Sequence, residues 1–181
     1  MIYSGLLVLI LTAVGGMLLT TLRSEEQVID SGDVNGYGQL ISSSVSSGVR
    51  NATALALTGN ADNTVQLLVL TTVSSDPMKT AAERVCEAWY YTELNGGVMY
   101  YQRGTAPQEI SPPTASDLTG WTLLGSGLSS TGQPIFTGAD ASSPAISLNF
   151  AIDANGGSGL AFISTTVKTR QGASTETATC F

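Results

Sequence analysis

Histidine is absent from this 181-residue chain, and cysteine occurs only twice. Without histidine there is no Ser-His-Asp or Cys-His arrangement, and no evident base is present to activate the serines. Two thiols and scattered carboxylates also supply too few ligands for an ordinary zinc site. The sequence therefore predicts a protein that is not an enzyme, with no catalytic residues, no metal site and no cofactor.

Basic residues are also few. Seven Lys and Arg residues stand against 14 Asp and Glu residues, which gives a net charge of −7, and the basic residues do not cluster. Lys and Arg supply most contacts to nucleic-acid phosphates, so binding of nucleic acid through a basic patch is not expected. Charged residues make up 12% of the chain and apolar residues 43%, which is enough for one compact core.

The longest uncharged stretch is the first 22 residues, which are mainly aliphatic. A helix rises about 1.5 Å per residue, so a helix of this length matches the ~30 Å hydrocarbon layer of a bilayer. A cleaved signal peptide would begin with basic residues, and none precedes this stretch. The sequence thus predicts a retained transmembrane helix over residues 1–22, in which Gly5, Gly15 and Gly16 allow other helices to pack closely.

Apolar residues then recur at intervals of three and four from Val34 to Leu55, with serines and other polar residues between them. This spacing indicates an amphipathic helix, which is expected to continue the membrane helix over residues 23–58. Gly38 and Gly48 lie within it, and each weakens a helix interior.

From residue 59 onward the pattern becomes that of β-strands. A nearly continuous apolar segment at 64–73 predicts a central strand that is covered on both faces. Two pairs of strand-like segments separated by turn residues predict two hairpins, 85–91 with 98–103 and 145–153 with 160–170. Residues 59–181 are therefore predicted to form an antiparallel β head domain.

Cys86 and Cys180 lie far apart in the sequence, and neither belongs to a C-x-x-C motif. They are open to two interpretations, a reactive thiol or a disulfide that ties the C-terminus to the start of the β region. The Ser-, Thr- and Gly-rich composition is typical of an extracytoplasmic protein, and disulfides persist in that compartment, which favours the disulfide. The head domain is then expected outside the cell and the N-terminus inside, as in a single-pass membrane protein.

The order of these features is distinctive: an apolar N-terminal helix, an amphipathic continuation, an antiparallel sheet and a late disulfide. In this layout the chain resembles the type IV pilins, and more narrowly the minor pilins or pseudopilins of the actinobacterial type. The local segments that carry the resemblance are 50–57, 65–73, CEAWYY at 86–91 and PIF at 134–136. The resemblance implies an α+β fold in which a long N-terminal helix, half membrane-spanning and half amphipathic, packs on an antiparallel β-sheet head domain.

The same resemblance implies a structural subunit of a type IV pilus or a related secretion or uptake filament. Such a subunit is anchored and assembled through its N-terminal helix and belongs to a cell-surface filament after assembly. The implied partners are other pilin subunits, the filament assembly machinery and, before assembly, the lipid bilayer. The family's leader and its mature Glu match no residue here, because no acid precedes Glu25. Either the natural start lies upstream of Met1, or the chain is an uncleaved member that begins there.

The alternative is a membrane-anchored extracellular domain that binds or adheres without polymerising. A plain anchor needs only a flexible linker after its membrane helix, whereas the spacing from Val34 to Leu55 indicates a rigid rod and favours the filament. A surface for a ligand, whose identity the sequence does not indicate, is expected at the loop 104–119 or the neighbouring tyrosines.

Overall fold

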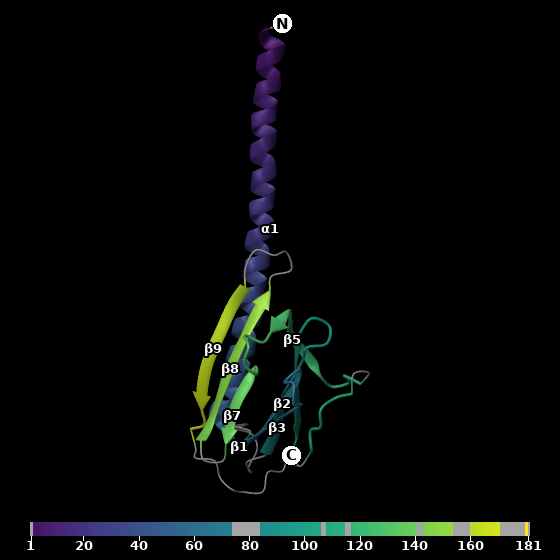
Figure 1. Cartoon of the computed structure of the whole chain (residues 1–181), viewed down its shortest axis with the longest axis vertical. Coiled ribbons are helices and arrows are strands. Elements are labelled where there is room, and N and C mark those ends of the chain that lie inside the picture. Colours follow the sequence, from purple (N-terminus) through teal and green to yellow (C-terminus); the bar gives the residue numbers. More distant parts are fainter. Residues whose placement is uncertain are drawn as a thin grey trace, which may run out of the picture.

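The computed structural model describes residues 2–73, 84–105, 108–114, 117–140, 143–153, 160–170 and 180. A helix, α1 (Ile2–Asn51), comes first along the chain. The nine strands in the described part are β1 (Ala52–Gly59), β2 (Val65–Val73), β3 (Arg84–Thr92), β4 (Val98–Thr105), β5 (Thr122–Ser126), β6 (Leu128–Ser129), β7 (Phe136–Asp140), β8 (Ser143–Asp153) and β9 (Leu160–Lys168). The C-terminal part of α1 lies against a β head, and its N-terminal part extends beyond the head as a rod (Figure 1).

The strands form two antiparallel sheets. Strands β1 to β5 make a five-stranded sheet in chain order. In the second sheet, β8 pairs with β6, β7 and β9. Both predicted hairpins are confirmed, since β3 pairs with β4 and β8 pairs with β9.

The core lies between the C-terminal part of α1 and the two sheets. One face of the helix is buried there through Ile41, Val45 and Val49. This stripe packs in one cluster with Leu68 and Leu70 of β2. Leu67 and Val69, which alternate with them, belong to a second cluster that also contains both cysteines. Side chains of a strand point alternately to opposite faces, so β2 is covered on both faces, as its apolar sequence predicts.

Two buried contacts join the sheets. The Gln66 side chain donates from Nε2 to the Phe136 carbonyl and accepts at Oε1 from the Phe136 amide, at 3.2 and 3.0 Å. At the turn between β3 and β4, the Gly97 carbonyl accepts from the Leu128 amide at 3.0 Å. Gly97 has a φ of +77°, and a Cβ there would clash with the Leu128 carbonyl, so glycine is required at this position.

The predicted fold class is wrong where the helix meets the sheet. The predicted amphipathic helix reaches residue 58, but α1 ends at Asn51 and residues 52–59 form β1. Ala and Leu alternate in this segment, and pairing with β2 outweighs the helical spacing that continues to Leu55. The head also contains two sheets where the prediction had one.

The predicted membrane-spanning half of the helix is also wrong. In the described part of the chain, no helix is long and apolar enough to cross a membrane. The prediction of a single-pass membrane protein, with its N-terminus inside and its head at the cell surface, is overturned by the same finding.

Candidate functional site

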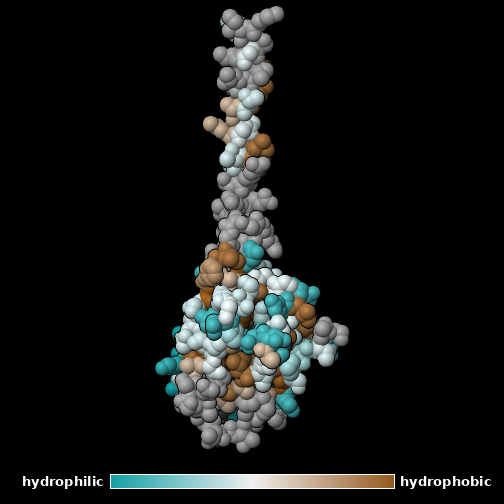
Figure 2. Space-filling model, viewed as in Figure 1, coloured by the Kyte–Doolittle hydropathy of each residue, from teal (hydrophilic) through white to brown (hydrophobic). Residues whose placement is uncertain are grey.

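The N-terminal part of α1 exposes large apolar side chains outside the head. Figure 2 shows separate brown and tan patches on the rod, which mark part of this apolar surface. The exposed large apolar side chains described in this part of α1 are Tyr3, Leu7, Leu11, Val14, Met17, Leu18 and Leu19. Tyr3 is 90% exposed and Met17 is 73% exposed, so the chain itself covers neither. Exposed apolar side chains that gather on one element make that element a candidate interaction site.

The rod has two faces of different shape. An α-helix turns about 100° per residue, so residues three and four apart lie on one side. One side of the rod, called the large face, carries large residues at this spacing: Tyr3, Leu7, Leu11, Val14 and Leu18. The same geometry places Gly5, Thr12 and Gly16 on the opposite side, next to Leu19, and this side is called the small face. A ridge of large side chains on one helix can approach another helix closely at such small residues.

The glycines of α1 fall into two groups. A Cβ at Gly38 would clash with the δ-methyl group of Ile163, and a Cβ at Gly48 would clash with the indole ring of Trp89. These two glycines let the sheets approach the helix. By contrast, a Cβ would meet no atom within 4 Å at the three predicted packing glycines, Gly5, Gly15 and Gly16. No contact within the described chain requires those three, although each weakens the helix by about 0.5–1 kcal/mol relative to alanine.

Sequence reasoning missed the packing role of Gly38 and Gly48 and interpreted both only as weak points in the helix. Gly48 lies three residues after Val45, on the stripe that is buried in the head. A glycine on a buried helix stripe is a signal for close approach, and it could have been used.

Threonine hydroxyls in the rod are already satisfied within the helix. Thr20 donates to the Gly16 carbonyl at 2.6 Å, and Thr21 donates to the Met17 carbonyl at 3.0 Å. A hydroxyl bonded in this way can be covered by apolar surface without leaving an unpaired donor. These two threonines therefore do not prevent the rod from being buried against another rod.

Polar side chains bridge the helix and the five-stranded sheet inside the head. Trp89 donates from Nε1 to Ser44 Oγ at 3.1 Å. Glu87, on the same face of β3, accepts from the Tyr101 hydroxyl at 3.1 Å and lies 3.7 Å from Arg103 Nε. The Glu87 side chain is only 15% exposed, so the hydroxyl and the guanidinium offset the cost of burying its charge.

Burial raises the pKa of Tyr101 to about 12. The charge of Glu87 and its hydrogen bond to Tyr101 add to this rise, and the charge of Arg103 opposes it. The ring also packs against Trp89, with centroids 5.2 Å apart. At neutral pH the phenol is therefore protonated and holds the Glu87 carboxylate against the sheet.

The outer face of the five-stranded sheet carries the two cysteines. Cys86 on β3 forms a disulfide with Cys180, across a sequence separation of 94 residues. The predicted disulfide is thus confirmed. The Cys180 carbonyl also accepts from the Ile110 amide at 3.1 Å, so this face holds both Cys180 and part of the 104–119 loop.

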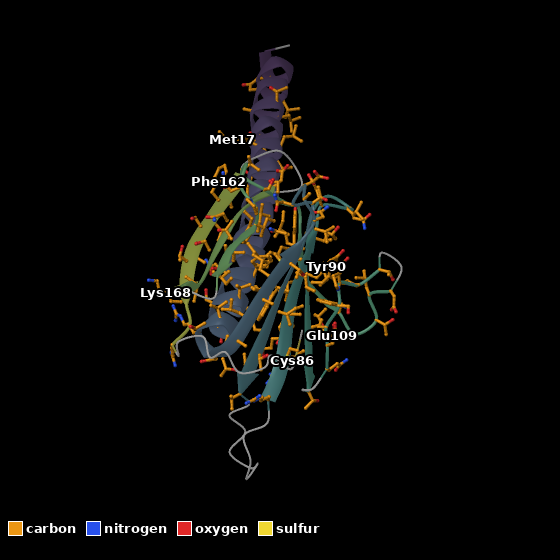
Figure 3. All side chains as sticks on the ribbon, turned by 60° about the horizontal axis from the view of Figure 1, so that its bottom comes forward. Met17, Cys86, Tyr90, Glu109, Phe162 and Lys168 are labelled. Atoms are coloured by element: carbon orange, nitrogen blue, oxygen red, sulfur yellow. A yellow bond between two sulfur atoms is a disulfide. The ribbon has the colours of Figure 1, made fainter. Side chains whose placement is uncertain are left out.

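Aromatic rings gather on the same outer face. Tyr90 stacks with Tyr100 at a centroid distance of 6.3 Å and contacts Trp121 at 5.8 Å. Figure 3 shows Tyr90 and Cys86 on the strands of this sheet, beside the loop that contains Glu109. Ile110 of that loop is buried in the same cluster, so this part of the loop contributes to packing. A ligand at this face stays a prediction.

The described residues include no group of three or more His, Cys, Asp or Glu side chains that could hold a metal ion. The features that remain as candidates are surfaces: the rod of α1, the aromatic outer face and the strand edges of the head. Comparison of the chain with protein-family models, with curated proteins and with solved structures found no match.

Proposed function

We propose that this chain is a structural subunit of a type IV pilus-like filament, a minor pilin or pseudopilin, that assembles through its rod. The observation that carries the proposal is the apolar rod itself, whose described large apolar side chains, among them Tyr3, Leu11 and Leu19, are exposed. Its partners are other pilin subunits and the machinery that assembles them. The head then decorates the filament, and the rods form its core.

The free energy of association favours contact of each rod with several neighbouring rods over contact with a single one. Full burial of a Leu, Val or Met side chain contributes about 1.5–3 kcal/mol. Covering the seven described large apolar side chains that the rod exposes is therefore worth on the order of 10 kcal/mol. Association costs about 4–15 kcal/mol in lost freedom of motion, so a single pair of rods that covers part of one face is marginal. A bundle that covers both faces of each rod is favoured.

The two faces of the rod also favour an open polymer. If the large face of one subunit packs on the small face of the next, each contact joins two different surfaces. Such heterologous contacts close into a ring or continue as a helical filament. Gly5 and Gly16, which no internal contact requires, give the approaching ridge the room that the contact needs.

Leucine substitutions on the small face test this proposal. Gly5→Leu/Gly16→Leu leaves the rod apolar and helical but fills the surface on which the neighbouring ridge would pack. We expect the purified wild-type chain to form filaments in negative-stain electron microscopy after removal of a dispersing detergent. The double variant should remain as small particles.

The matched control is Gly36→Leu, which makes the same change in the same helix. A Cβ at Gly36 also meets no atom within 4 Å, but this residue lies outside the apolar stretch. The control should assemble like the wild type. Filaments of normal length from the double variant, or none from the wild type, would count against assembly through the rod.

A further inference from the structure

Strand β9 is an open edge of the second sheet. It pairs with β8 along all nine of its residues, and it has no other partner among the described strands. In Figure 1, β9 lies at the outer margin of the head and runs in the same direction as α1. Among the described residues, no strand pairs with the backbone N–H and C=O groups of β9 that point away from β8.

This edge lacks the usual protection against pairing with another strand. The sequence of β9, LAFISTTVK, contains no proline and no charge before Lys168. Its register with β8 continues without a bulge from Leu160 to Lys168. Natural edge strands are commonly protected by proline, bulges or charges pointing inward, so a long regular edge is a site for strand addition.

The exposed face of β9 is suited to a second copy of itself. Leu160 and Phe162 are exposed at the start of the strand, and Thr166 and Lys168 are exposed towards its end. If two copies pair antiparallel about Ser164, Phe162 of one copy lies opposite Thr166 of the other. Aromatic and β-branched residues form favourable cross-strand pairs in this arrangement.

The charges at the two ends of the edge are also complementary. Asp153 lies on β8 beside Leu160, and Lys168 lies at the opposite end of β9. Antiparallel pairing places Lys168 of one copy next to Leu160 of the other copy. Asp153 of that other copy lies on β8, beside Leu160 and on the same face of the sheet. Strands are about 4.8 Å apart, so the two charges are within about 10 Å at each end of the pair, which is near one Debye length.

We propose that the β9 edge is a second self-association surface, at which two heads pair through antiparallel β9 strands. Because β9 runs in the same direction as α1, the rods of the two copies point in opposite directions (Figure 1). This contact therefore cannot lie within one bundle of parallel rods. If the proposed filament forms, the contact joins subunits of two filaments that run in opposite directions.

Ser164→Cys in the full chain tests the pairing directly, because Ser164 would meet its own copy on the two-fold axis. The native cysteines are joined to each other and do not compete. The protein is kept dispersed in mild detergent that covers the rods, oxidised, and run on a non-reducing gel. We expect a covalent dimer that forms faster than in the control Thr122→Cys, which is exposed on β5 at the edge of the other sheet. Equal rates would overturn the proposal.

Exchanging the charges of Asp153 and Lys168 is a second test of the antiparallel β9 pairing. In the Ser164→Cys background, Asp153→Lys places like charges at both ends of the pair and should slow dimer formation by about fivefold, because exposed ion pairs are weak but two of them become repulsive. Adding Lys168→Asp restores opposite charges and should restore the rate. No slowing, or slowing without rescue, contradicts the antiparallel arrangement.

The rod variant separates this proposal from the proposed function. Gly5→Leu/Gly16→Leu in the Ser164→Cys background should abolish filaments and leave the disulfide dimer unchanged. If the dimer is lost with the filaments, the cross-link depends on the rods and the β9 proposal is wrong. If the dimer forms and the wild-type chain yields no filament, the β9 proposal stands and the filament proposal fails.

Discussion

At the scale of single residues, Gly48 is the point where the helix and the five-stranded sheet come closest. A Cβ there would clash with the Trp89 ring and would lie 3.1 Å from Leu70 Cδ1. Alanine favours a helix interior over glycine by about 0.5–1 kcal/mol, but overpacking against a fully buried indole typically costs about 1–3 kcal/mol. The clash is therefore the larger of the two effects.

We expect Gly48→Ala to lower the free energy of unfolding by roughly 1–2 kcal/mol, measured by chemical denaturation. Gly36→Ala is the matched control in the same helix. Because a Cβ at Gly36 meets open space, this change should raise stability by about 0.5–1 kcal/mol. The same sign for both variants would contradict the packing role given to Gly48.

Tyr101 makes the stability of the head sensitive to alkaline pH. Its pKa is raised from 10.0 to about 12 in the folded state, mainly by burial. Between these values the folded state binds more protons than the unfolded state, so stability falls as pH rises. The contribution of Tyr101 is complete below about pH 10 and lost above about pH 12. Burial, with the charge of Glu93, also raises the pKa of Tyr91, which adds to the decline.

Tyr101→Phe should therefore flatten the decline. The variant loses the hydrogen bond to Glu87, so its stability at neutral pH is expected to be lower than that of the wild type. The diagnostic quantity is the slope of the unfolding free energy between about pH 10 and pH 12, which should be shallower in the variant. Equal slopes in the two proteins would show that Tyr101 does not titrate in this window.

At the scale of elements, the disulfide ties the C-terminus to the middle of the five-stranded sheet. It closes a loop of 94 residues, and cross-links of this kind stabilise small domains by about 2–4 kcal/mol, largely by restricting the unfolded chain. Mass spectrometry of the unreduced protein should find no free thiol, and Cys86→Ser/Cys180→Ser should unfold at lower denaturant concentration. Two alkylatable thiols in the native protein would contradict the pairing.

The strands were predictable where periodicity and turn chemistry agree. The segment that forms β2 was predicted from its nearly continuous apolar sequence, and the two hairpins were predicted from strand-like segments separated by turn residues such as Asn and Gly. Asn95 illustrates this, since its φ of 61° is a conformation that asparagine tolerates in a turn.

The boundary between α1 and β1 could not be predicted from local pattern. Residues 52–57, ATALAL, satisfy both a helical and a strand spacing. The choice is made by β2, which pairs with this segment from Thr72 back to Gln66. That pairing is a tertiary interaction, and so is the division of the head into two sheets, which depends on distant contacts such as Gln66 with Phe136.

The candidate site was predictable only in part. The sequence indicates Gly5, Gly15 and Gly16 as packing glycines, and the helix places Gly5 and Gly16 on one face. The length of the apolar stretch favoured a membrane span, but no helix in the described part of the chain is long and apolar enough to cross a membrane. The open edge of β9 was not predictable, because strand order is set by the whole head.

At the scale of the whole molecule, the chain consists of a rod and a β head. The helix of 50 residues is about 75 Å long, and only its C-terminal part is covered by the sheets (Figure 1). In the rest of the helix, the described large apolar side chains are exposed. We propose that the large face of one rod packs on the small face of another.

Cysteine cross-linking of the rods tests this claim most directly. Leu11→Cys marks the large face and Thr12→Cys marks the small face of the same turn. In a heterologous contact neither single variant meets its own copy, so each should give mainly monomer after oxidation of assembled protein. The double variant Leu11→Cys/Thr12→Cys should give a ladder of covalent multimers, because each subunit then contributes to two different contacts. Efficient dimers from a single variant, or no ladder from the double variant, would contradict the account.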